Sequence, residues 1–377
     1  MFQLRLDDEL ALALRERHHA TALAGLIDAN REHLARWFAW APTADEATAR
    51  AWAEAGLEQF RRGDGWHATL LERGERVGSV GLHYLDRLRG VTEIGYWLAE
   101  HAQGRGLMTR TLAELLPHFF EGHGLDKVVI GVSPENVRSA ALPERFGFTL
   151  EARIRAAHEQ PGGTRGDLVF YGLLREEWRE TEAAGNAPAR VARLPRFALE
   201  GDDGLHVALL EATDAAPLAE LVIADADHLG PWFPWVEGAS EASVRDFIEQ
   251  RALAAFAAGE GFEAGIWLHE RLAGAIGVHE VDVRAGRGQI GYWIGREHEG
   301  RGAVTRAVRR VLQRQFDDLG FRKLEIRADA DNHRSRAVAE RLGFTFEGTL
   351  RRALWNGRES VDQVVYGLLR EEWERSD

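Results

Sequence analysis

The chain has 377 residues, of which 45% are hydrophobic. That is more than one hydrophobic core usually serves, so we expect two globular domains. With 47 basic and 60 acidic residues the formal net charge is −13, which disfavours a nucleic-acid partner, because such proteins need basic patches. There are no cysteines, which excludes disulfides, a thiolate nucleophile and a cysteine-ligated zinc site, and we predict no metal ligands.

The N-terminal sequence MFQLRLDDEL carries acids where a signal peptide has a basic segment and an apolar core. No apolar run approaches the roughly 20 residues that a membrane span requires. We therefore expect a cytoplasmic protein with no membrane partner.

The first half opens with a predicted strand, Leu10–Arg15, and a predicted helix, His18–Asn30. Asp45 is a suitable N-cap for a second helix, Asp45–Arg61. Turn signals RGER and RLRG then separate three predicted strands, Trp66–Leu71, Arg76–Leu85 and Thr92–Leu98.

A helix is predicted over Leu107–Glu121, because its apolar residues fall on one helical face: Leu107, Leu112, Leu115, Leu116 and Phe119. A strand, a helix and two strands follow, at Lys127–Val132, Arg138–Arg145, Phe148–Ile154 and Leu168–Leu174. Antiparallel hairpins that pass into a β-α-β-α-β section predict an α/β domain, with a mixed, mostly antiparallel sheet covered by helices.

The whole pattern occurs twice. IGYWLAEHAQGRG (Ile94–Gly106) returns 196 residues later as IGYWIGREHEGRG, with seven of thirteen positions identical. Three further segments recur in order: HLARWFAW as HLGPWFPW, NVRSAALPERFGF as NHRSRAVAERLGF, and YGLLREEW unchanged. A repeat this long is a duplicated domain, since solenoid units are roughly 20–50 residues.

The duplication predicts an N-terminal domain over residues 1–180, a linker over 181–196 and a C-terminal domain over 197–377. We expect the two domains to form a pseudo-dimer, within either a monomer or a homodimer. The linker, TEAAGNAPARVARLPR, is less polar in its second part than a flexible tether, so we expect it to pack on a domain.

A glycine turn, QGRG in the first copy and EGRG in the second, lies between a strand and a helix in each half. Such a turn presents backbone N–H groups at a helix N-terminus, where the dipole favours an anion and glycines let a phosphate approach. The spacing fits neither a Walker loop nor the three-glycine Rossmann fingerprint. On its own, the turn is equally compatible with a purely structural connection between strand and helix and with phosphate binding.

The segments around the turn narrow this choice. Some 30 residues after it stands N-x-x-S followed by E-R-F-G-F or E-R-L-G-F, and YGLL lies on the last predicted strand. This ordered set resembles the GNAT superfamily of acetyl-CoA-dependent N-acetyltransferases, and within it the RimJ/RimL branch. The resemblance covers nearly all of both halves. One departure is that His101 and Glu297 occupy the leading Q/R position of the family's turn.

The resemblance implies acetyl transfer from acetyl-CoA to a primary amine, and it implies roles by position. The turn would hold the pyrophosphate, through Gln103, Gly104, Arg105, Gly106 and Thr109 and through Gly300, Arg301, Gly302 and Thr305. The preceding strand and the asparagines would hold the pantetheine, through Tyr96, Trp97, Leu98, Trp293, Ile294, Asn136 and Asn332. Ser139 and Ser335 would donate to the leaving thiolate, directly or through water. The alternatives are a helix N-cap for Asn136 and an ordinary first-turn serine for Ser139.

A general base must reach the amine, and Glu93 matches the position of a glutamate in many members of the superfamily. His158 or Glu159 is a second candidate. The second copy has Gln289 and Leu354 at these positions, so we predict that the first half is the better catalyst. The second half would be slow, selective for another amine, or retained for cofactor binding; His279, Glu280 or water would have to replace the base.

The acceptor cannot be identified from the sequence beyond a peptide N-terminus or a small amine. Tryptophans in the repeated HLxxWFxW segment are candidates for an acceptor wall or, equally, for core anchors: Trp37, Trp40, Trp232 and Trp235. His83 and its counterpart His279 are further candidates, with a structural role favoured. The alternative function is a regulatory protein in which one or both halves bind acetyl-CoA without turnover.

Overall fold

The computed structural model describes residues 1–160, 163–183 and 196–374, which form two compact units. One unit contains Gln3–Phe197, and the other contains Ala198–Asp377 together with Met1 and Phe2. Most of the predicted linker, residues 184–195, lies outside the described residues. In the described ranges, no helix combines the length and the apolar composition needed to cross a membrane.

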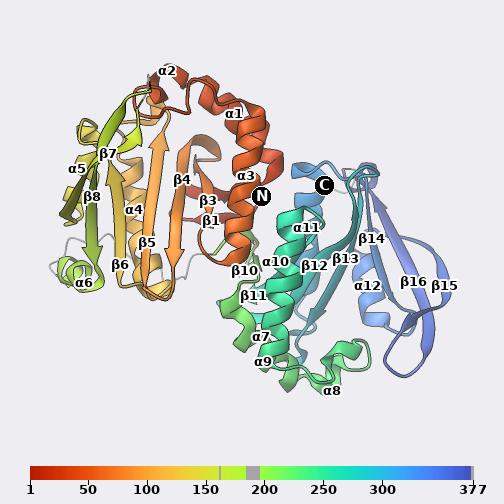
Figure 1. Ribbon diagram of the computed structural model, residues 1–377. Helices are drawn as coiled ribbons and strands as arrows, with labels where there is room; N and C mark the ends of the chain where they lie inside the picture. The colour runs from red at the N-terminus through yellow and green to blue at the C-terminus, as the bar shows by residue number, and fades with distance from the viewer. Residues whose placement is uncertain (161–162, 184–195, 375–377) are drawn as a thin grey trace. The chain divides into compact units, whose positions relative to one another are not determined.

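The N-terminal unit is an eight-stranded sheet with helices packed on it (Figure 1). Its strands are β1 (Gln3–Arg5), β2 (Leu10–Leu14), β3 (His67–Glu72), β4 (Glu75–Asp86), β5 (Val91–Leu98), β6 (Lys127–Val132), β7 (Thr149–Glu159) and β8 (Arg165–Leu174). Its helices are α1 (Ala20–Asp28), α2 (Arg31–Leu34), α3 (Glu46–Arg62), α4 (Leu107–Pro117), α5 (Val137–Arg145) and α6 (Arg175–Ala183).

The strands lie in the order β1-β2-β3-β4-β5-β6-β8-β7. All neighbouring pairs are antiparallel except β5 and β6, which are parallel and are linked through α4. This is the mixed, mostly antiparallel sheet that the sequence predicts.

The C-terminal unit repeats this topology, with the order β9-β10-β11-β12-β13-β14-β16-β15 and one parallel pair, β13 and β14. Its strands are β9 (Ala198–Glu200), β10 (Leu205–Leu209), β11 (Phe262–Leu268), β12 (Arg271–Asp282), β13 (Arg287–Ile294), β14 (Lys323–Asp329), β15 (Thr345–Trp355) and β16 (Ser360–Leu369). Its helices are α7 (Ala215–Ala224), α8 (Ala226–Leu229), α9 (Glu241–Asp246), α10 (Leu253–Ala258), α11 (Ala303–Gln313), α12 (His333–Arg341) and α13 (Arg370–Trp373).

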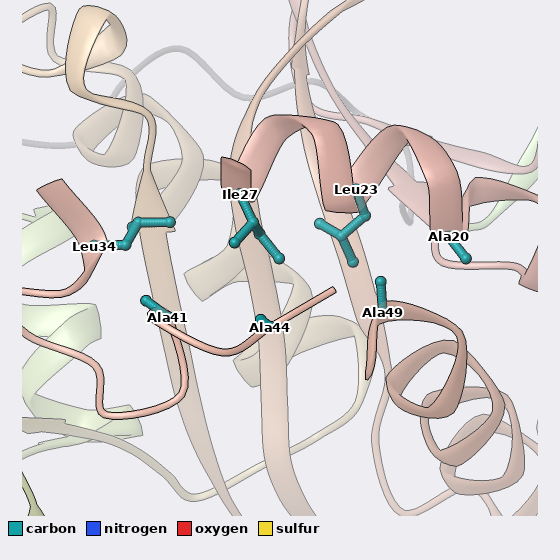
Figure 2. Packing of buried hydrophobic residues seen from close by; sticks show 7 residues of the cluster. All are labelled: Ala20, Leu23, Ile27, Leu34, Ala41, Ala44 and Ala49. Carbon is teal, nitrogen blue, oxygen red and sulfur yellow. The ribbon is translucent and has the colours of Figure 1, made fainter. Parts of the chain in front are cut away.

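Two helices, α4 and α1, contribute buried side chains to the core of the N-terminal unit. On α4 and the turn after it, the predicted apolar face is confirmed, since its five members are each at most 1% exposed. On the other helical layer, Leu23 and Ile27 of α1 face small residues of the 41–49 segment (Figure 2). The alanines there, Ala41, Ala44 and Ala49, let helix and segment approach closely, and partly buried aromatic rings pack on this cluster.

Several predicted elements differ in extent from the observed ones; among them, β8 begins at Arg165 and α4 ends at Pro117. The strand predicted at Phe148–Ile154 is β7, which continues to Glu159. The apolar–polar alternation fails there because β7 is the edge strand and is exposed at most of its residues. The helix predicted to begin at His18 starts as α1 at Ala20, after a 3₁₀ turn at Arg17–His19.

Candidate functional site

A cavity of about 780 Å³ opens on one face of the N-terminal sheet. Its floor is made by glycines at facing register positions, because Gly81 of β4 pairs with Gly95 of β5, and Gly131 of β6 follows on the same face. A Cβ on Gly81 or Gly95 would collide with a histidine ring, His67 and His83 respectively. The missing side chains leave room for neighbouring polar groups to lie over the sheet.

Glu93 lies on this floor, over β6. A Cβ built on Gly131 would stand 3.2 Å from its Oε1. His83 reaches the same cavity from a β-bulge, since the β4–β5 register shifts between Leu82 and Tyr84. Bulges turn a side chain relative to a regular strand, which brings this histidine to the site.

His158 and Glu159 line the cavity from the end of β7. The β7–β8 register shifts between Ile154 and His158, and Ala156 has a positive φ of 51°. The buried Nδ1 of His158 has no hydrogen-bond partner in the part of the chain that the structure describes. The bulge thus carries two of the predicted base candidates to the cavity that also contains Glu93.

Asn136 and Ser139 line the cavity at the start of α5. Asn136 caps this helix, since its Oδ1 accepts from the Ser139 amide at 3.2 Å, so the structural alternative for Asn136 is observed. The Ser139 Oγ and the Tyr96 hydroxyl lie 3.4 Å apart, and burial raises the pKa of Tyr96 to about 12. Two hydroxyl groups, rather than one, are therefore available at this point of the cavity.

The glycine turn precedes α4 as predicted. Gly104 and Gly106 have φ values of 71° and 74°, and a Cβ on either would enter open space. The turn therefore leaves its backbone accessible at a helix N-terminus, where an anion is stabilised.

The side chains of the turn are engaged within the protein. Gln103 lies between His33 Nε2 (2.7 Å) and Arg138 Nη1 (3.0 Å). Arg105 pairs with Glu72 at 2.7 Å, and the Thr109 hydroxyl accepts from Arg145 at 2.8 Å. Any contact these residues make to a phosphate is thus expected from their backbone.

The strand before the turn has an open edge. Among the described strands, β6 pairs with β5 only over Val91–Glu93, so Ile94–Leu98 extends beyond that pairing. Tyr96 and Trp97 of this portion line the cavity. Together with the open turn, this edge leaves the backbone accessible to an extended chain that carries an anionic group to the helix N-terminus.

The aromatic segment forms both a core anchor and a cavity wall. The Trp40 ring lies 5.0 Å from Trp52 and 6.4 Å from Trp97, and it packs against the buried alanine cluster. Trp37 and Trp40 also line the cavity. The two interpretations of these tryptophans, as core anchors and as a wall of the cavity, are therefore compatible.

Several residues that line the cavity were missed by the sequence analysis: Arg15, Trp52, His67 and Ser79. No repeated motif contains them, and three of the four change type in the second copy. A comparison of the two halves for charged positions that differ would have found Arg15 and His67.

The C-terminal unit keeps the framework of this site. Asn332 caps α12 through the Ser335 amide at 3.0 Å, and Tyr292 lies 3.1 Å from the Ser335 hydroxyl. Gly300 and Gly302 have φ values of 70° and 71° with open space in front. Glu299 replaces Gln103 and contacts His228 at 3.3 Å.

Other residues predicted for the second site take matching places. Thr305 accepts from Arg341 at 2.9 Å, as Thr109 does from Arg145, and Arg301 lies in the turn before α11. Trp293 and Ile294 end β13, whose pairing with β14 stops at Ile290. Trp235 is half exposed, with its ring 6.2 Å from that of Trp293, while Trp232 lies in the turn before it.

The base positions of the second unit differ chemically. The Oε1 of Gln289, at the position of Glu93, is buried without a partner among the described residues. His279 Nδ1 lies 3.2 Å from Glu263 Oε1, and burial raises the pKa of Glu263 to about 8. A buried acid thus occupies the place of His67.

The chain has relatives among known proteins. The model of the acetyltransferase (GNAT) domain matches residues 10–149 and 205–345. The chain is similar to "Putative ribosomal N-acetyltransferase YdaF" of Bacillus subtilis (strain 168), at 37% identity over 47% of this chain and 98% of that protein. It is also similar to the ribosomal-protein-serine acetyltransferase of Escherichia coli (strain K12), at 26% identity over 41% of this chain and 87% of that one. A solved structure described as a probable acetyltransferase covers 47% of the chain at 33% identity, with a TM-score of 0.44.

Proposed function

Because the chain belongs to the GNAT family of acyltransferases, whose cofactor is acetyl-CoA, we propose that its N-terminal unit is the more active N-acetyltransferase of the two. The observation that carries the proposal is one cavity containing Glu93, the Tyr96–Ser139 pair and the open edge of β5. The C-terminal unit has the same framework with Gln289 and Leu354 in place of the base candidates.

When bound, acetyl-CoA supplies the thioester whose acetyl group the amine takes as the thiol leaves. The backbone of the turn from Gln103 to Gly106 binds the pyrophosphate, and the free edge of β5 positions the arm. Glu93 takes the proton that the attacking amine loses, and its place on the cavity floor gives it access to that amine.

The Tyr96–Ser139 pair supplies a proton on the thiol side. Ser139 Oγ donates to the Tyr96 hydroxyl at 3.4 Å, so the two hydroxyl groups lie side by side where the departing thiolate needs a proton. His158, with its unpartnered Nδ1, orients the acceptor or a water next to Glu93. Trp37, Trp40 and His83 form the wall against which the acceptor lies.

The acceptor is a primary amine, and a peptide or protein N-terminus is favoured over a small amine. Support comes from the two relatives described above, whose names refer to ribosomal proteins and, in one case, to serine. With such an acceptor, we infer that the protein acts in the cytoplasm. The C-terminal unit binds acetyl-CoA with slower turnover, which Gln289 favours because an amide cannot accept the proton.

The test exchanges the base residues between the units and follows thiol release in the presence of peptides that begin with serine or alanine. Glu93→Gln gives the first unit the residue of the second, and we expect kcat to fall about 100-fold or more. Gln289→Glu is the matched control and should not lower it. Unchanged turnover in Glu93→Gln would remove Glu93 from the mechanism, and loss in Gln289→Glu alone would assign the activity to the C-terminal unit.

A further inference from the structure

Arg15 is a buried cation at the cavity of the N-terminal unit. It directly follows β2, its backbone N–H donates to the His67 carbonyl at 2.9 Å, and the residue is 6% exposed. Its Nη2 donates to Ser79 Oγ at 2.6 Å, and it lines the cavity. Its buried Nε has no hydrogen-bond partner within the described residues.

Within the described residues, the charge of Arg15 has no counter-ion. Among the described residues it forms no ion pair, and its hydrogen-bond acceptor is a neutral hydroxyl. Burial lowers the pKa of Arg15 to about 10, so the guanidinium stays charged at neutral pH. His67 beside it is neutral, since burial and the Arg15 charge lower its pKa to about 4. A buried, unpaired charge is costly, and a bound anion removes that cost.

The Glu93 carboxylate lies in another part of the cavity from Arg15. Ser79, which holds Arg15, pairs with Trp97, four residues along β5 from Glu93. At a strand rise of about 3.3 Å per residue, Trp97, which lies beside Ser79, is about 13 Å from Glu93 along β5. The Glu93 carboxylate lies over β6, on the side away from Ser79. A hydrogen bond of about 3 Å at each end takes up part of this span, so an acceptor that meets Glu93 with its amine and Arg15 with a second group needs on the order of 10 Å between the two groups.

The C-terminal unit lacks this cation. At the positions of Arg15, Ser79 and His67 it has Leu210, Ala275 and Glu263. Leu210 is 1% exposed, and Glu263 lies beside His279. One copy thus places a permanent cation where the other has leucine and an acid, although both keep the glycine turn and the Asn-x-x-Ser segment.

We propose that Arg15 binds an anionic group of the acceptor, so that the N-terminal unit selects amines that carry a carboxylate about 10 Å away, as a tripeptide or tetrapeptide does. This inference rests on the proposed function, because it assumes that the cavity holds the acceptor. It assigns to Arg15 the choice of acceptor rather than the chemistry of transfer.

The experiment compares acceptors that differ only in the anion: Ser-Gly-Gly and Ala-Gly-Gly-Gly, each as the free acid and as the C-terminal amide. With the full chain, kcat/KM is expected to be about 10- to 100-fold higher for the acids, as for a charged hydrogen bond. Arg15→Leu, which copies Leu210, should remove this preference while leaving the amides within about threefold. Arg15→Lys should keep part of it. Acetyl-CoA affinity reports whether each variant is folded.

Three results would overturn the proposal: no preference for the acids in the intact chain, an equal loss for acids and amides in Arg15→Leu, or a preference that persists in that variant. If Arg15→Leu does not fold, Ser79→Ala is used instead. It keeps the Arg15 cation but removes the hydrogen bond that positions it, so a reduced preference for the acids is expected. If no peptide is acetylated, the proposed function fails separately. Calorimetric binding of the same peptide pairs to the protein saturated with coenzyme A then decides whether Arg15 holds the anion.

Discussion

Burial gives two different residues the same charge state at one position of the two copies. His67 lies on β3 and Glu263 on β11, the first strand of the matching hairpin in each unit, and burial disfavours the charged form of each. It lowers the pKa of His67 to about 4 and raises that of Glu263 to about 8. Both are therefore neutral near pH 7, but only Glu263 becomes charged under mildly alkaline conditions.

Glu263 predicts a pH-dependent stability of the C-terminal unit. Its folded-state pKa is raised, so its contribution is fully present below about pH 4.5 and is lost as the pH rises through about 8. Glu263→Gln removes that loss. We expect the variant to be more stable than the parent by at least about 1 kcal/mol at pH 9, with little difference at pH 5. His279, 3.2 Å away, reduces the gain to the extent that it is protonated.

Thermal unfolding at the two pH values measures this difference. The control is Glu260→Gln, which removes an exposed carboxyl near the same strand. A gain for Glu263→Gln that is equal at pH 5 and pH 9 would show that folding does not raise the pKa of this carboxyl.

At the scale of elements, α5 carries a residue that regular helices avoid. Pro143 is buried inside the helix and has no N–H, so the Ser139 carbonyl lacks its helical donor. The Tyr96 hydroxyl lies 3.4 Å from that carbonyl. In the second copy α12 has Ala339 at this position, and Tyr292 donates to the Ser335 carbonyl at 3.0 Å.

Pro143→Ala should therefore raise the free energy of unfolding of the N-terminal unit by about 1–2 kcal/mol, because the regained helical hydrogen bond outweighs the larger conformational entropy that alanine gives the unfolded chain. The reciprocal change, Ala339→Pro, should lower that of the C-terminal unit by about 3 kcal/mol or more. Denaturant unfolding of both variants tests the pair. A loss of stability in Pro143→Ala would mean that packing of the proline ring outweighs the missing bond.

Elements with strong periodicity could be predicted from the sequence, and those shaped by bulges could not. The face of α4 and the mixed sheet follow from spacing alone. The bulges before His158 and at His83 leave no periodic signal, yet they bring these histidines to the cavity. Arg15 was not predicted as a site residue for a different reason. A single charged residue after a strand is usually exposed to solvent, and only the fold shows that this one is buried.

On the scale of the whole molecule, the duplication has kept one part of the site and changed another. Both copies retain the open glycine turn, the capped N-x-x-S helix and the tyrosine–serine contact. The cavity floor differs at Arg15, His67, Ser79 and Glu93, all of which change type in the second copy. We infer that cofactor binding and acceptor choice depend on separate sets of residues, so that each can be removed without the other.

This separation predicts that the chain binds two acetyl-CoA molecules. Gly104→Glu and Gly300→Glu each add a charged side chain to the open space before a helix N-terminus, where the pyrophosphate is expected. Calorimetric stoichiometry should fall from two to one in either variant and to zero in the double variant. Gly124→Glu and Gly320→Glu are matched controls, because these glycines also have positive φ values, 66° and 70°, and open space, but lie outside the turns. They should retain two sites. A stoichiometry of two in Gly104→Glu would mean that the first turn does not bind the pyrophosphate. A stoichiometry of one in the intact chain, unchanged in Gly300→Glu, would mean that the C-terminal unit binds no cofactor.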